Sequence, residues 1–171
     1  MPVTRLNHAV LYVRDVARSV DFYRSALDFR VVTTIAGGKA AFLQAPASTN
    51  DHDLGLFEVG ATAAASPAGR GAVGMYHLAW EVDTLDELAA LATRLEARGA
   101  LAGMSDHGTT KSLYAHDPDG LEFEVAWLVP ADRLTPDLTI GTSRLDLPAE
   151  IARYGGSTLG GVGVSFAASS V

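Results

Sequence analysis

An internal repeat is the feature that most constrains the fold of this chain. His8-Ala9-Val10 precedes an apolar pattern of helical period, and His77-Leu78-Ala79 precedes a second one. Each half also ends on a similar strand-like string, Phe57-Glu58-Val59 in the first and Phe123-Glu124-Val125 in the second. A unit that recurs in this way indicates two copies of one supersecondary motif, because neither copy buries its apolar face alone.

Hydrophobic periodicity predicts the same order of elements in both halves. The first half has the pattern of a strand, a helix and three strands; these are residues 5–13, a helix of about a dozen residues capped by Asp15, and residues 29–35, 39–45 and 52–59. The second half begins with a strand at residues 75–82 and a helix that Thr84 caps and Gly99 ends, and strands follow toward Trp127. The pattern predicts an α+β fold of two tandem βαβββ modules.

Small and flexible residues separate the two repeats and close the chain. Residues 61–74 are mostly Ala and Gly without periodicity, which is typical of a linker. We therefore expect the first module at residues 1–60 and the second at residues 75–129. Residues 130–171 are expected to form a C-terminal extension, with a short helix at 147–154. The Gly/Ser/Ala-rich tail from residue 155 is expected to be mobile unless a subunit or the cleft covers it.

Composition and charge exclude several classes of protein. The chain has 171 residues, 48% of them hydrophobic, which suffices for one buried domain or for two small halves that share a core. A net charge of −7 without a Lys/Arg cluster argues against a nucleic-acid partner. The absence of cysteine excludes disulfides and thiolate metal sites. We expect a cytoplasmic protein without a membrane partner, since the sequence has neither a signal-peptide pattern nor an apolar stretch of bilayer length.

The stretch after residue 116 predicts a hairpin with one polar face. Asp117-Pro118-Asp119-Gly120 has the composition of a tight turn, because proline presets φ and glycine accepts the left-handed conformation. In the strand that follows, apolar residues at odd positions alternate with Glu122 and Glu124. Such carboxylates are commonly a solvated strand face, so their meaning depends on what lies opposite them.

Two histidines occupy corresponding positions on the first strand of each half. His8 and His77 are expected on the face opposite to the bulky residues that meet the helix. One such histidine is usually a satisfied core or cleft residue, but a repeated one, with Glu124 at the end of a closing strand, favours a metal site. If the two sheets curve to enclose a cleft, two imidazoles and one carboxylate form a facial ligand set that leaves coordination positions open for catalysis.

These motifs resemble those of the vicinal oxygen chelate superfamily, which includes glyoxalase I, the fosfomycin and bleomycin resistance proteins and the type I extradiol dioxygenases. The resemblance covers about residues 4–129. It is carried by His8-Ala9-Val10-Leu11-Tyr12-Val13, His77-Leu78-Ala79, the Asp117-Pro118-Asp119-Gly120 turn and Glu124. The resemblance implies the fold, with curved sheets that enclose a metal-binding cleft, but leaves the reaction open because the superfamily hosts many chemistries.

Three further residues make the chain most similar to a single-domain type I extradiol enzyme, such as a catechol 2,3-dioxygenase. His52 in His52-Asp53-Leu54 matches the acid–base histidine of that branch, Tyr114 precedes Glu124 at the matching separation, and His107 matches a second histidine. Taken singly, each has a structural explanation as a loop-end, core or surface residue. The resemblance implies Fe(II), or alternatively Mn(II), held by His8, His77 and Glu124. It also implies a catechol-type diol and O2 as substrates, and a homodimer or higher homo-oligomer.

Two alternative functions remain open at this point. Glu58, on the strand of His52 and in the string that repeats around Glu124, could act as a fourth metal ligand. The protein would then be a lyase or isomerase like the glyoxalase and epimerase members of the superfamily, without redox chemistry. The other alternative is a metal-free resistance protein that binds a small molecule. The three ligand-type residues argue against it, because a binding cleft has no need of them.

Overall fold

A computed structural model describes residues 2–3, 5–69, 71–135 and 140–161. The chain divides into two units. Unit 1 consists of Met1–Pro67 together with Asp117–Leu121, and unit 2 consists of Ala68–His116 together with Glu122–Val171. Among the described residues, no helix combines the length and the apolar character needed to cross a bilayer.

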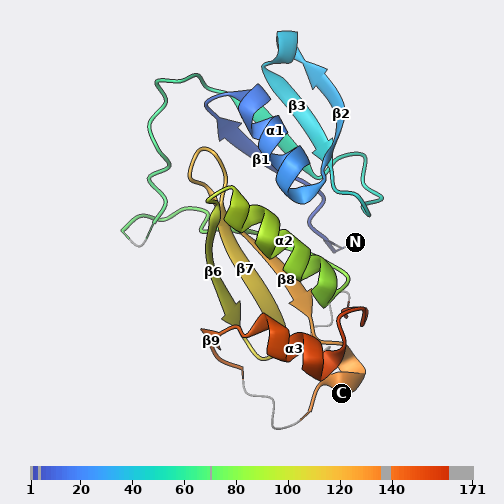
Figure 1. Ribbon diagram of the computed structural model, residues 1–171. Helices are drawn as coiled ribbons and strands as arrows, with labels where there is room; N and C mark the ends of the chain where they lie inside the picture. The colour runs from blue at the N-terminus through green and yellow to red at the C-terminus, as the bar shows by residue number, and fades with distance from the viewer. Residues whose placement is uncertain (1, 4, 70, 136–139, 162–171) are drawn as a thin grey trace. The chain divides into compact units, whose positions relative to one another are not determined.

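Unit 1 is a four-stranded mixed sheet with one helix packed against it (Figure 1). Its elements are β1 Ala9–Val13, α1 Val16–Leu27, β2 Arg30–Ile35, the short 3-10 turn η1 Ala36–Gly38, β3 Ala40–Gln44 and β4 Leu54–Glu58. The strand order is β1-β4-β3-β2, with β1 parallel to β4. Helix α1 begins where predicted, because the Asp15 carboxylate accepts the Arg18 N–H at 2.9 Å and so caps its first turn.

Unit 2 repeats this arrangement and adds a strand at the sheet edge. Its elements are β5 Leu78–Glu81, α2 Leu85–Ala97, β6 Leu101–Asp106, β7 Thr110–His116, β8 Glu122–Leu128, the 3-10 turn η2 Ala131–Arg133, β9 Ser143–Arg144 and α3 Leu147–Tyr154. The strand order is β5-β8-β7-β6-β9. Thr84 and Glu87 form a reciprocal capping box at the start of α2. The predicted α+β fold of two βαβββ modules is therefore confirmed, and the predicted short helix coincides with α3.

Strand β8 alternates as its sequence predicts. Phe123, Val125 and Trp127 are buried, whereas the half-buried Glu122 and Glu124 lie on the other face. The strand pairs in antiparallel fashion with β7, so the predicted hairpin is present. The apolar positions on one face of β8 thus form part of the core of unit 2, and the opposite face is left for polar side chains.

The turn of this hairpin belongs to unit 1, although both of its strands belong to unit 2. The Asp119 carboxylate accepts hydrogen bonds from the Arg14 backbone N–H at 2.9 Å, from Arg14 Nη1 at 2.9 Å and from Arg18 Nη2 at 2.6 Å. Asp117 closes the turn by accepting the backbone N–H groups of Asp119 and Leu121. The turn therefore has a structural role within unit 1, where it is bonded to residues at the start of α1.

The C-terminal extension is attached to unit 2 over its described length. The Gly156 carbonyl accepts the N–H of Asp86 at 2.9 Å, and the Thr158 carbonyl accepts Trp127 Nε1 at 3.2 Å. The Gly161 N–H donates to the Leu128 carbonyl at 3.1 Å. The expectation of a mobile tail is therefore wrong for residues 155–161, because the Asp86 N–H, the Trp127 indole N–H and the Leu128 carbonyl hold this segment. Residues 162–171 lie outside the described part of the chain.

Candidate active site

Polar side chains gather on the face of the unit 2 sheet that is opposite to the buried one. Strand β8 lies between β5 and β7, and its register sets Glu124 opposite Ala79 on one side and opposite Tyr114 on the other. Because residues opposite each other in a sheet share a face, His77, Ser112, Tyr114 and Glu124 are presented together. Strand β5 and the β7–β8 hairpin, which are distant in sequence, thus contribute to one polar patch.

The centre of this patch is the contact between His77 and Glu124. His77 Nε2 lies 3.1 Å from Glu124 Oε2, and His77 Nδ1 lies 3.6 Å from Glu122 Oε1. The Nδ1 atom is buried and has no hydrogen-bond partner in the part of the chain that the structure describes. Two ligands at right angles, each about 2.1 Å from an ion, are about 3 Å apart, so the Nε2–Oε2 distance suits neighbouring ligands as well as a hydrogen bond. An imidazole and a carboxylate fit a divalent ion such as Fe(II) or Mn(II).

The predicted ligands are divided between the two units. His77 and Glu124 lie in unit 2, whereas His8 lies in unit 1. Across the part of the chain that the structure describes, no three His, Asp or Glu side chains gather into a group that could hold a metal ion. The structure thus brings together two of the three predicted ligands, and the complete set remains a hypothesis.

Ser112 is a member of the patch that sequence analysis missed. Its hydroxyl donates to Glu124 Oε1 at 2.5 Å, and the residue is fully buried. This hydrogen bond engages one oxygen of Glu124 while Oε2 faces His77. The signal in the sequence is a small polar residue two positions before Tyr114, hence on the same face of β7, but its partner is known only from the pairing of β7 with β8.

Tyr114 and His107 form a hydrogen-bonded pair beside this contact. His107 Nε2 lies 2.9 Å from the Tyr114 hydroxyl oxygen. Burial, together with the negative charge and hydrogen bonding of Glu124 and the nearby Tyr76 and Glu122, raises the pKa of Tyr114 to about 12. The phenol is therefore neutral at physiological pH and retains its proton for hydrogen bonding.

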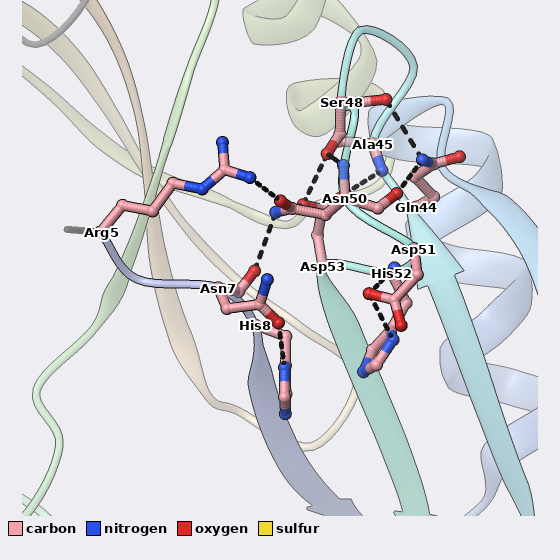
Figure 2. Close-up of polar contacts among 10 residues, drawn as sticks. All are labelled: Arg5, Asn7, His8, Gln44, Ala45, Ser48, Asn50, Asp51, His52 and Asp53. Atoms are coloured by element: carbon pink, nitrogen blue, oxygen red, sulfur yellow. Dashed lines mark hydrogen bonds and ion pairs between the residues drawn. The ribbon is translucent and has the colours of Figure 1, made fainter. Parts of the chain in front are cut away.

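In unit 1, His8 and His52 lie side by side (Figure 2). Their ring centroids are 4.5 Å apart, and the His52 ring also packs edge-on against Phe42 at 5.0 Å. His8 Nδ1 contacts Asn7 Oδ1 at 2.7 Å, while His52 Nδ1 lies 3.3 Å from Asp51 Oδ1. The first predicted ligand and the predicted acid–base residue are thus neighbours, although 44 positions of sequence numbering separate them.

A buried carboxylate organises the loop that carries His52. Asp53 accepts hydrogen bonds from the Ala45 N–H at 2.8 Å, from Ser48 Oγ at 2.8 Å and from Asn50 Nδ2 at 2.7 Å. Asn50 in turn donates to the Asn7 carbonyl at 2.9 Å, next to His8 (Figure 2). The Asp53 network therefore ties the His52 loop to the start of β1, and this explains how the two imidazoles meet.

Glu58 does not occupy the position equivalent to Glu124. Val10, two residues after His8, pairs with Gly55, just as Ala79, two residues after His77, pairs with Glu124. Glu58 instead pairs with the buried Val13. By alternation Glu58 belongs to the face of the buried Leu54 and Leu56, whereas the His52 ring contacts His8 and Phe42. The expectation that Glu58 is the mate of Glu124 and shares a face with His52 is therefore wrong. The two modules differ in loop length, so the matching sequence strings around Glu58 and Glu124 are three positions out of structural register.

Comparison with known proteins yields matches for most of the chain. The model of the family described as "Glyoxalase/Bleomycin resistance protein/Dioxygenase superfamily" matches residues 5–125. The chain is 30% identical to a catechol-2,3-dioxygenase of Bacillus subtilis (strain 168), over 71% of this chain and 41% of that protein. It is 34% identical to a biphenyl-2,3-diol 1,2-dioxygenase 2 of Rhodococcus globerulus, over 93% of this chain and 75% of that protein. A crystal structure of lactoylglutathione lyase from Agrobacterium tumefaciens has 26% identity and a TM-score of 0.54, covering 74% of this chain and 95% of that one.

Proposed function

Because the chain belongs to the glyoxalase/bleomycin resistance protein/dioxygenase superfamily, we propose that it is an extradiol dioxygenase, which uses Fe(II) and O2 to cleave the ring of a catechol-type diol. Relatives at 30% and 34% identity are named as dioxygenases of aromatic diols. The observation that carries the proposal is the Tyr114–His107 hydrogen bond of 2.9 Å on the same sheet as the His77–Glu124 contact. A phenol and an imidazole beside a candidate metal site are suited to hold a substrate oxygen.

The proposed metal ligands are His8, His77 and Glu124. The spacing of His77 and Glu124 supports this assignment, and Ser112 restrains the carboxylate by occupying its other oxygen. When bound, Fe(II) supplies a template for both diol oxygens and O2 and a route for electrons between them. Mn(II) is the alternative ion, because it accepts the same nitrogen and oxygen ligands.

His52 is the proposed acid–base residue. Its position beside His8 supports a role next to a ligand. It would take a proton from a diol hydroxyl and return one as the O–O bond breaks, for which imidazole is well suited. Phe42 and Asp51 restrain the ring from two sides. Tyr114 and His107 would hold a substrate oxygen by hydrogen bonds.

The proposal is tested by loading the protein with Fe(II) under anaerobic conditions and then adding a panel of catechols and air. We expect O2 uptake and a yellow ring-cleavage product that both depend on the added metal. A metal-loaded protein that consumes no O2 with any catechol of the panel would overturn the proposal. Light scattering of the same preparation tests the expected homodimer or higher homo-oligomer.

A lyase or isomerase is the second candidate, favoured by the similarity to lactoylglutathione lyase over 95% of that chain. Such a site would use Glu58 as a fourth ligand, a role that its pairing with Val13 does not support. Glu58→Gln decides between the two candidates. The dioxygenase proposal expects unchanged metal content in this variant, whereas loss of the metal supports the lyase or isomerase.

A further inference from the structure

The C-terminal extension contributes two groups that contact His107. Strand β9 pairs with β6, with Ser143 opposite Asp106, and this pairing continues the sheet next to His107. His107 Nδ1 lies 3.1 Å from the Gly141 carbonyl oxygen and 3.1 Å from Thr142 Oγ1. Gly141 and Thr142 both lie beyond residues 5–125, the part of the chain that the family model matches.

These contacts decide which imidazole nitrogen carries the proton. A carbonyl oxygen accepts hydrogen bonds and never donates them, so the Gly141 contact favours a proton on His107 Nδ1. A neutral imidazole has one donor and one acceptor, so Nε2 is then the acceptor. The Tyr114 hydroxyl, 2.9 Å from Nε2, must be the donor in this pair.

We infer that Thr142 and the Gly141 carbonyl are positioning groups, which hold His107 in the Nδ1–H tautomer so that Nε2 accepts the Tyr114 hydroxyl proton. The competing acceptor for that proton is Glu124, which also interacts with the Tyr114 phenol. With the phenol proton directed to His107, the Glu124 carboxylate is left to bind the ion. The importance of this arrangement for turnover rests on the proposed dioxygenase function, but the tautomer itself does not.

The tautomer is measured in the metal-free protein labelled with [15N]histidine, by two-bond proton–nitrogen correlation spectra at neutral pH. A His107→Asn variant assigns the His107 signals by their disappearance. We expect a protonated Nδ1 and an unprotonated Nε2. A His107 with its proton on Nε2 would overturn the inference regardless of enzyme activity.

Substitution of Thr142 tests the positioning role. Thr142→Val keeps the shape of the side chain but removes the hydroxyl, so we expect a larger fraction of the Nε2–H tautomer of His107. We also expect kcat to fall by about three- to tenfold at nearly constant KM, which is the effect of losing one uncharged hydrogen bond. Thr142→Ser should restore both values, and Ser143→Ala, on the exposed neighbouring residue, should match the wild type. A Thr142→Val protein with wild-type spectra and wild-type kcat contradicts the inference. If no variant cleaves a catechol, the dioxygenase proposal fails, and the spectra still decide the tautomer.

Discussion

The contact of His77 with Glu124 concentrates two ligand-type groups on one polar sheet face. Their 3.1 Å separation is a hydrogen-bond distance without an ion, while His77 Nδ1, the other ring nitrogen, is buried and has no hydrogen-bond partner among the described residues. Ser112 adds a hydrogen bond to the second carboxylate oxygen. Groups restrained in this way bind an ion with less loss of side-chain freedom, which is the advantage of a preorganised site.

The first prediction concerns these ligands. We expect about one divalent ion per chain. Losing a ligand's hydrogen-bond partner commonly weakens metal binding by about ten- to hundredfold, so His77→Ala and Glu124→Ala, which remove a ligand itself, should weaken it by at least that much. Anaerobic calorimetric titration with Fe(II) measures the affinity. His116→Ala is the matched control, because this imidazole is about half exposed and lies near Glu122 rather than Glu124. Unchanged affinity in both ligand variants would refute the assignment.

The second prediction separates proton transfer from metal binding at His52. His52→Phe should keep the ion and still bind a catechol, but kcat should fall by about a hundred- to ten-thousandfold, the usual effect of losing a general acid–base group. Steady-state kinetics and metal analysis of one preparation measure both properties, with His116→Phe as the control. Wild-type turnover in His52→Phe would exclude this residue as the acid–base group.

The third prediction concerns the Tyr114 phenol. Since burial and the Glu124 charge raise the pKa of Tyr114 to about 12, the folded metal-free protein should keep this phenol neutral through pH 10. Any free energy of unfolding gained from the retained proton is fully present below about pH 10, the pKa of tyrosine in the unfolded chain. This contribution is lost as the pH rises toward 12. Ultraviolet titration of the wild type minus Tyr114→Phe measures the midpoint, with the exposed Tyr12→Phe as control. A midpoint near 10 would contradict the argument.

At the scale of elements, a buried lysine links β7 to helix α3. Lys111 Nζ lies 2.6 Å from Asp106 Oδ1 and 3.0 Å from Glu150 Oε2, and only 1% of its side chain is exposed. Burial opposes ionisation of Asp106, but the hydrogen bonds from Lys111 and the Gly108 N–H and the nearby positive charges leave the pKa of Asp106 below its ordinary value. The cluster thus holds the extension helix to the sheet by charge rather than by apolar contact alone.

The fourth prediction follows from this cluster. Lys111→Met should lower the free energy of unfolding by about 3–5 kcal/mol at pH 7, because it leaves partly buried carboxylates without their cation. The lowered pKa of Asp106 contributes stability above about pH 4 that is lost as the pH falls, so the difference between wild type and variant should shrink in acid. Urea unfolding at pH 7 and at an acidic pH below about 4 measures this difference. The control is Lys39→Met, at the other lysine of the chain, which is exposed. An equal loss of unfolding free energy in this variant would refute a specific role for the cluster.

At the scale of the whole molecule, the proposed ion should stabilise the entire chain. A ligand that binds the folded state alone adds about 2.7 kcal/mol to the free energy of unfolding at a concentration of 100 times its Kd. For a chain of 171 residues this corresponds to a rise in Tm of about 5–10 °C. Thermal unfolding with Mn(II), with and without a chelator, measures the rise. His77→Ala should show none, and a wild-type Tm that Mn(II) does not change would count against a resident metal.

Much of the fold could be predicted because its signals are local. Asp15 and Thr84 cap helices by hydrogen bonds within one turn, and the alternation of residues 121–127 identifies the buried face of β8 without knowledge of its neighbours. The same locality explains why the helix at Leu147–Tyr154 was predicted with its correct bounds. The prediction of a mobile tail was wrong over residues 155–161. A Gly-rich segment has no periodicity that would reveal its contacts, and this one is held by backbone hydrogen bonds to distant elements.

By itself, the sequence determined which elements form and which residue types are available for chemistry, because caps, turns and periodicity act over a few residues. Only the tertiary structure decided which of those residues meet. The sequence repeat aligned Glu58 with Glu124, but the strand register shows that Gly55 is the position equivalent to Glu124. The β7–β8 hairpin was itself predicted, but only its observed register shows that Ser112 meets Glu124, and pairing of β9 with β6, which are far apart in the chain, brings Thr142 to His107. Register between strands distant along the chain depends on loop lengths and on the packing of whole faces, and no local pattern encodes either.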